Sequence, residues 1–177
     1  MEQKMIVFGG SGNSGKFLLK HLSAIPGLSI VATSRNPAKA QAYPNVKWIQ
    51  ADPKDRKTYI EEMKGCGVAV SLLGSEDKKN VDVYSKGYPE IIKAMEEAGV
   101  ARLIFVSASH DHPDQPFFFK HVIKPAFLSH VFDDMERMDK FFNAYNGPVK
   151  WTNLRPMRLV DGKRKKEKEK TALAHSP

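Results

Sequence analysis

The chain contains little cysteine, no long apolar run and, over most of its first third, no carboxylate side chain. Cys66 is the only cysteine among the 177 residues, which excludes a disulfide within the chain and favours a reducing compartment. No apolar stretch approaches the roughly 20 residues needed to cross a bilayer, and the N-terminus lacks the pattern of a secretory signal. We therefore expect a cytoplasmic protein that does not bind membranes.

Acidic residues are absent between Glu2 and Asp52, whereas this stretch holds six lysines and arginines. A basic first third suits a polyanionic ligand. The formal net charge is +8, and half of it comes from a Lys/Arg/Glu run at 163–170. With 41% hydrophobic and 27% charged residues, we expect one globular domain over residues 1–162, followed by a basic, disordered tail over 163–177.

A glycine-rich stretch follows the first apolar run of the sequence. It comes directly after the strand-like residues 5–8 and leads into the helix-like residues 17–22. Glycines allow a sharp turn and a close backbone approach to a pyrophosphate, and the next helix offers its N–H groups and positive dipole end. The pattern predicts a dinucleotide-phosphate loop made of Gly9, Gly10, Ser11, Gly12, Asn13, Ser14 and Gly15. The alternative is a corner in which glycine serves packing alone.

Short apolar runs alternate with amphipathic stretches along the rest of the chain. The runs predict strands at 4–8, 29–33, 46–50, 68–73, 103–107 and 150–154. The amphipathic stretches predict helices at 14–23, 55–64, 81–98 and 131–144, with Gly99 ending the third of them. We predict an α/β fold with a doubly wound, mostly parallel, Rossmann-like sheet in the order 3-2-1-4-5-6. Its ligand should lie across the carboxyl ends of the strands.

The predicted second strand is followed by Arg35 and not by an acid. Sites for NAD usually place Asp or Glu there to bind the ribose 2′-hydroxyl, whereas NADP sites offer Arg and small hydroxyls to the 2′-phosphate. Arginine's planar fork pairs well with phosphate, and Ser34 or Asn36 would add a donor. We therefore predict NADP(H) as the cofactor. The alternative is that Arg35 is an ordinary surface residue.

Six short motifs then follow one another in a recognisable order. They are FGGSGNSG at 8–15, TSRNP at 33–37, ADP at 51–53, SLLG at 71–74, GVARLIFVS at 99–107 and LRPMRLVDG at 154–162. The succession resembles the atypical short-chain dehydrogenase/reductases, and among them the NAD(P)H-binding group that contains biliverdin-IXβ/flavin reductase and the NmrA-like proteins. That group usually continues with a further strand and helix where this chain has its Lys/Glu run. We expect those C-terminal elements to be missing.

The resemblance implies roles for residues by their position. The glycines and polar residues of the loop would hold the pyrophosphate, Arg35 the 2′-phosphate, and Asp52 would flank the adenine. Ser107 or Ser109 would face the nicotinamide and the substrate, which makes them the candidate catalytic residues. The remaining cofactor contacts implied are Leu72, Leu73, Gly74 and Pro156.

No side-chain proton donor stands out in the sequence. The Tyr-x-x-x-Lys pattern of typical short-chain dehydrogenases occurs once, at Tyr43 and Lys47, between the second and third predicted strands. We interpret it as a chance match. Reduction of a flavin or tetrapyrrole needs no such acid, because the cofactor supplies hydride and solvent can supply the proton. We predict a monomeric NADPH-dependent reductase of a small planar electron acceptor; the alternative is a non-catalytic NADP(H)-sensing protein of the NmrA type.

The stretch 108–130 is long for a loop inside a domain and carries unusual residues. His110 and His112 lie among aspartates, but no third ligand is fixed by spacing, so we expect no metal site. The run 117–119 of three phenylalanines either lines a pocket for an aromatic substrate or fastens the loop to the core. Nucleic-acid binding by the basic tail is disfavoured, because the tail mixes in glutamate and lacks aromatic residues.

Overall fold

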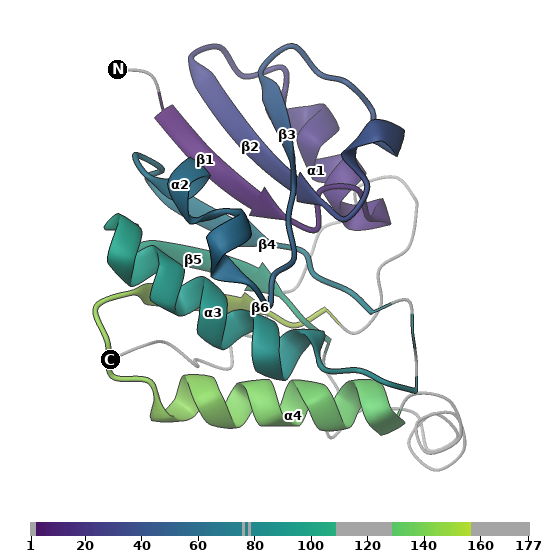
Figure 1. Cartoon of the computed structure of the whole chain (residues 1–177), viewed down its shortest axis with the longest axis vertical. Coiled ribbons are helices and arrows are strands. Elements are labelled where there is room, and N and C mark those ends of the chain that lie inside the picture. The colour runs from purple at the N-terminus through teal and green to yellow at the C-terminus, as the bar shows by residue number, and fades with distance from the viewer. Residues whose placement is uncertain (1–2, 76, 78, 109–128, 157–177) are drawn as a thin grey trace.

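The computed structural model describes residues 3–75, 77, 79–108 and 129–156. Its six strands are β1 (Gln3–Phe8), β2 (Leu28–Ser34), β3 (Val46–Gln50), β4 (Val68–Ser71), β5 (Arg102–Val106) and β6 (Lys150–Leu154). All neighbouring strands are parallel, in the order β3-β2-β1-β4-β5-β6 (Figure 1). This confirms the predicted Rossmann-like fold and strand order. The strand order reverses between β1 and β4, and in such sheets the ligand crevice lies at the carboxyl ends of the strands near this point.

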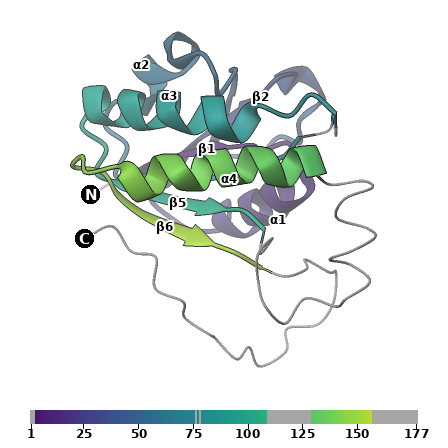
Figure 2. The same cartoon turned by 90° about the horizontal axis from the view of Figure 1, so that it is seen from below.

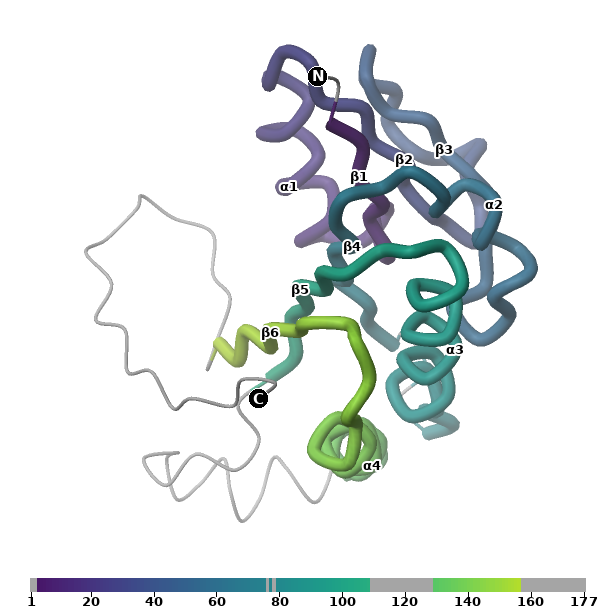
Figure 3. Tube along the Cα trace, turned by 90° about the vertical axis from the view of Figure 1, so that its left-hand side faces the viewer, coloured from purple at the N-terminus to yellow at the C-terminus, as the bar shows by residue number. Residues whose placement is uncertain are grey.

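Helices cover the two faces of the sheet unequally. The helical segments are α1 (Asn13–Leu22), α2 (Ile60–Met63), α3 (Val83–Ala98), α4 (Ser129–Ala144) and the 3₁₀ turns η1 (Pro37–Lys39) and η2 (Arg56–Thr58). Figures 2 and 3 show α1 on one side of the sheet and α2, α3 and α4 on the other. Parallel strands need helical crossovers, so this layering follows from the alternation of strands and helices in the chain.

The larger part of the core lies beneath α3 and α4. Tyr88, Phe105, Phe142 and Trp151 form a chain of ring contacts, with centroids 4.6–5.1 Å apart from one ring to the next. Each such side chain contributes about 2–3 kcal/mol when it leaves water. The α1 face holds a smaller cluster centred on Leu19. The sheet and its helices therefore support the carboxyl ends of the strands from both sides.

The predicted helix over 81–98 is present from Val83 onwards. Gly99 ends it in the left-handed conformation, with φ of 73°, and its N–H donates to the carbonyl oxygens of Glu96 and Met95. This confirms the predicted C-cap, because a residue with a Cβ rarely adopts that conformation.

Two predicted elements are shorter than the sequence pattern suggests. The predicted helix 55–64 is divided into η2 and α2 at Tyr59, whose φ of −144° and ψ of −8° are not helical. Asp55 caps the start of η2 by accepting the Lys57 N–H. The predicted strand 68–73 ends at Ser71. The Leu72 N–H still donates to the Phe8 carbonyl, and the chain then leaves the sheet toward the crevice.

Several predictions fall on residues outside the described part of the chain. They concern Ser109, the His110–His112 stretch, the phenylalanine run 117–119 and the basic tail 163–177. In the part that is described, no helix combines the length and apolar character that crossing a membrane requires.

Candidate functional site

A cavity of about 850 Å³ opens at the carboxyl ends of the strands. Its walls come from the loops after β1, β2, β3 and β4, from the end of β5, and from α3 and α4. Eleven residues that the sequence predicted for the site line this cavity: Gly9, Ser11, Gly12, Asn13, Ser14, Arg35, Asp52, Leu72, Leu73, Gly74 and Ser107. These residues are far apart in the sequence, but because all strands are parallel, their carboxyl ends lie at the same edge of the sheet.

The glycine loop has one role in packing and another at the cavity. Gly9 has φ of +74°, and a Cβ there would lie 2.5 Å from the Leu72 carbonyl oxygen, so the loops after β1 and β4 touch only because Gly9 lacks a side chain. A Cβ on Gly15 would collide with the Gly9 carbonyl oxygen. Because Gly15 has no side chain, α1 can pack against the loop. Gly12 lines the cavity, and there a Cβ would meet only the Gly9 carbonyl oxygen, at 3.3 Å.

The first turn of α1 fits a pyrophosphate group. Gly12 is the N-cap, with extended backbone and no capping side chain, and no acidic residue lies in the first turn. The N–H groups of a first turn have no acceptor within their own helix, and here Asn13 and Ser14 lie in the cavity wall. Unpaired N–H groups and the positive helix end attract phosphate oxygens. The residues present therefore fit a bound dinucleotide.

At the end of β2, the hydroxyl groups are partly committed to each other. Ser34 Oγ donates to Ser11 Oγ over 3.1 Å and accepts the Asn36 backbone N–H at 3.1 Å. Ser34 and Asn36 were each predicted as a possible donor to a phosphate; the Ser34 hydroxyl hydrogen and the Asn36 backbone N–H are used within the protein. Ser11 keeps its own hydroxyl hydrogen, and the exposed Arg35 lines the same cavity.

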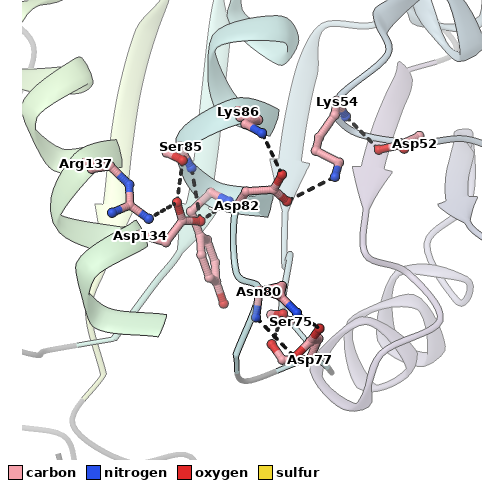
Figure 4. Close-up of polar contacts among 11 residues, drawn as sticks. Asp52, Lys54, Ser75, Asp77, Asn80, Asp82, Ser85, Lys86, Asp134 and Arg137 are labelled. Atoms are coloured by element: carbon pink, nitrogen blue, oxygen red, sulfur yellow. Dashed lines mark hydrogen bonds and ion pairs between the residues drawn. The ribbon is translucent and has the colours of Figure 1, made fainter. Parts of the chain in front are cut away.

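On the other side of the cavity, the loop after β3 and the start of α3 are joined by ion pairs, which Figure 4 shows. Lys54, after β3, donates to Asp82 Oδ1 over 3.0 Å, and Lys86 lies 3.0 Å from Asp82 Oδ2. The Lys86 and Lys54 ammonium groups, in that order of importance, lower the pKa of the Asp82 carboxyl. Asp77 accepts the backbone N–H groups of Lys79 and Asn80, and these bonds lower its pKa. Both carboxylates stay ionised well below neutral pH.

A buried acid from α4 holds the start of α3. Asp134 has no exposed surface, and its Oδ2 accepts the Tyr84 N–H at 2.9 Å and the Ser85 N–H at 3.3 Å (Figure 4). Its Oδ1 accepts the Ser85 hydroxyl and the Arg137 guanidinium. α3 lacks a capping side chain of its own at Asp82. Asp134 therefore caps α3 from a neighbouring helix and fixes Tyr84 in the cavity wall.

Ser107 lies at the end of β5 and is 9% exposed. Its hydroxyl donates to Asn153 Oδ1 on β6 over 2.8 Å, so its lone pairs are the part left for a ligand. Tyr84 also faces the cavity, and burial raises the pKa of its phenol, while a backbone hydrogen bond from Ser75 opposes the shift. Both side chains can orient a ligand. Neither is arranged to release a proton near neutral pH.

Some predicted residues lie outside the cavity wall. Gly10 and Gly15 are packed against their neighbours, and Pro156 follows β6 without lining the cavity. Tyr43 donates to the Lys16 carbonyl, at 3.5 Å, while Lys47 pairs with Glu62 at 2.6 Å. Neither member of that Tyr/Lys pair lines the cavity, in agreement with its interpretation as a chance match.

Residues of the site that the sequence did not predict include Lys16, Asp82, Asp134 and Asn153. Asp134 carried a signal, because it is a carboxylate on the apolar side of α4 that also presents Met135 and Met138. For Asp82 the only local sign was the i,i+4 spacing to Lys86, which is common on exposed helices, and its cavity partner Lys54 is 28 residues away. Asn153 carried no signal, because its partner Ser107 is 46 residues away. Lys16 was visible only as one of many surface lysines.

A parallel sheet in this order, with a glycine loop entering a helix at its switch point, defines a dinucleotide-binding Rossmann domain. The chain belongs to the NAD(P)H-binding family, whose family model matches residues 9–176. This confirms the resemblance at the level of the family and gives the site a nicotinamide cofactor. No curated protein matches the chain in sequence.

Solved structures with the same fold resemble the chain at low sequence identity. A Rossmann-fold NAD(P)-binding family protein from Shigella flexneri is 22% identical, with a TM-score of 0.67 over 93% of this chain and 72% of the other. The oxidoreductase ylbE from Lactococcus lactis is 23% identical, with a TM-score of 0.65 over 87% and 68%. A short-chain dehydrogenase/reductase from Veillonella parvula is 14% identical, with a TM-score of 0.71 over 88% and 69%. At these identities the likeness shows the fold.

Proposed function

We propose that the protein is an NADP(H)-dependent reductase that passes hydride from the nicotinamide to a planar electron acceptor, a flavin or a biliverdin-like tetrapyrrole. The observation that carries the proposal is the convergence of the glycine loop, Arg35 and Ser107 on one cavity. Membership of the NAD(P)H-binding family supports the nicotinamide. Arg35, with no carboxylate after β2 to bind a ribose hydroxyl, supports the 2′-phosphorylated form.

The residues of the cavity would bind and orient the two reactants. When bound, the nicotinamide supplies two electrons and a hydrogen nucleus as hydride. The first-turn N–H groups of α1 would bind the pyrophosphate, and Arg35 would pair with the 2′-phosphate. The Ser107 oxygen, held by Asn153, would accept an amide N–H from the carboxamide or from the substrate.

The nature of the proposed acceptor follows from what the described cavity walls offer. Tyr84 has a raised pKa and Ser107 already donates its hydrogen to Asn153, so neither is poised as a general acid. A ketone would need such an acid at the alkoxide that forms. A flavin or tetrapyrrole spreads the added charge over its ring system and takes its proton from water.

The second candidate is an NADP(H)-sensing protein of the NmrA type, which would bind the nucleotide without transforming it. The same shortage of a proton donor within the described walls favours it. A sensor would bind NADP and NADPH with similar affinity and would not consume NADPH in the presence of acceptors.

Calorimetric titration with NADPH and NADH, followed by turnover with FMN, riboflavin and biliverdin, tests the proposal. We expect NADPH to bind at least about tenfold more tightly than NADH, since hydrogen bonds to charged groups contribute about 1.5–3 kcal/mol. Arg35→Ala should remove most of this preference. Lys39→Ala is the matched control, because Lys39 is also exposed and cationic but lies outside the cavity wall.

Three results would count against the proposal. Failure of the wild-type chain to bind either nucleotide would overturn the cofactor assignment. An unchanged preference in Arg35→Ala would remove Arg35 from the 2′-phosphate site. Tight NADPH binding without turnover on any of the three acceptors would replace the reductase with the sensor.

A further inference from the structure

The charges around the cavity are divided between its two sides. The three acids of its wall, Asp52, Asp77 and Asp82, lie on the loops after β3 and β4. The side formed by β1, α1 and β2 has no carboxylate at all, because residues 3–51 contain neither aspartate nor glutamate. Two cations of this side, Lys16 and Arg35, line the cavity together with Ser34.

Among the described residues, Lys16 differs from Lys54, the other lysine of the cavity wall, in having no anionic partner. Lys54, the third cation of the wall, is bound to Asp82, and Lys47 is bound to Glu62. Within the described part of the chain, the Lys16 ammonium makes no hydrogen bond or ion pair. It also stands in the first turn of α1, where the helix dipole disfavours a positive charge unless an anion lies nearby.

A 2′-phosphate would carry more charge than one guanidinium can balance. A phosphate monoester holds about −1.5 to −2 charges at pH 7. Among the hydroxyl groups nearby, that of Ser34 already donates to Ser11. The binding of a dianion at this end would therefore leave about one negative charge uncompensated if Arg35 acted alone.

We infer that Lys16 is the second cation of the 2′-phosphate site and, together with Arg35, determines the preference for NADP(H) over NAD(H). This inference rests on the proposed NADP(H) function and adds a residue that the sequence motif does not assign. Arg35 would supply the planar fork, and Lys16 a mobile ammonium with three donors on the α1 side of the phosphate. The pyrophosphate would remain with the N–H groups of the loop and helix.

Calorimetry with two small probes separates the two phosphate sites without any turnover. The probe 2′,5′-ADP carries the 2′-phosphate, whereas 5′-ADP carries the pyrophosphate and a free 2′-hydroxyl. Lys16→Gln should weaken 2′,5′-ADP binding at least about tenfold and 5′-ADP binding less than about threefold. Lys16→Arg should keep most of the affinity for 2′,5′-ADP. Lys20→Gln is the matched control, because Lys20 is an exposed lysine of the same helix outside the cavity wall.

Each outcome has a distinct meaning. Equal loss for both probes in Lys16→Gln would place the ammonium at the pyrophosphate and overturn the inference. Unchanged binding of both probes would make Lys16 a surface lysine and overturn it as well. If the wild-type chain bound NADPH no better than NADH, the NADP(H) proposal itself would fail, which is a different result from a silent substitution at Lys16. Circular dichroism of each variant checks that α1 is intact.

Discussion

The two sides of the cavity are built by different physical means. The β1–α1 side consists of backbone that turns through glycines within a few residues, and its charges are cationic. The β3–β4 side consists of side chains that reach across the fold, from Lys54 to Asp82 and from Asp134 to the start of α3. A short motif can encode the first side. The second requires the whole tertiary structure to be in place.

The largest loss of stability is expected from a substitution on the β1–α1 side of the cavity. Gly15→Ala should lower the free energy of unfolding by about 3 kcal/mol, because the new Cβ would collide with the Gly9 carbonyl oxygen and push α1 away from the loop. Urea unfolding measures this loss. Gly67→Ala is the control, since a Cβ there finds its nearest contact 3.9 Å away, and it should change stability by less than about 1 kcal/mol.

An effect of about 2 kcal/mol is expected on the opposite side from Asp134→Ala. This change would leave the Tyr84 and Ser85 N–H groups without their acceptor and separate α4 from the start of α3. Asp133→Ala, which removes the exposed neighbouring carboxylate, should stay within about 0.5 kcal/mol of wild type. Equal losses in the two variants would show that the cap does not stabilise α3.

The smallest loss of stability is expected from breaking the ion pair between Lys54 and Asp82. Asp82→Asn should cost less than about 1 kcal/mol at pH 7, because both Asp82 and Lys54 are more than a third exposed. The sign with pH follows from the lowered pKa of Asp82. The stabilisation is complete above the ordinary value of 3.8 and disappears as the pH falls through the lower pKa of the folded state.

Urea unfolding of wild type and Asp82→Asn at pH 7 and pH 3 checks this dependence. The difference between the two proteins should shrink on acidification. A difference that grows as the pH falls would contradict the direction assigned to the pKa of Asp82.

The same contrast explains what the sequence could predict. The glycine loop, Arg35 and the end of α3 at Gly99 depend on patterns within a few residues, and the strand order on the alternation of short strands and helices along the chain. Reasoning from these patterns placed them correctly in the fold. The division of the helix at Tyr59 and the end of β4 at Ser71 depend on hydrogen bonds whose geometry no periodicity records.

The hydrogen-bond partners of the site residues could not be predicted from the sequence. Ser107 could be placed at the end of a strand, but the commitment of its hydroxyl to Asn153 depends on β5 and β6 being adjacent. The position of Asp134 on the apolar side of its helix indicated burial, but its partners on α3 could not be known before α4 was seen packed against α3. Side-chain pairing across some fifty residues of sequence leaves no local spacing to detect.

The cap that Asp134 places on α3 also bears on how the protein emerges from the ribosome. A nascent chain that has exposed only its first hundred residues already contains β1, the glycine loop, α1 and the whole of α3. It does not yet contain the carboxylate that anchors the first turn of α3. The first turn of α3 thus lacks this acceptor until the segment around residue 134 has been synthesised and α4 has docked against α3.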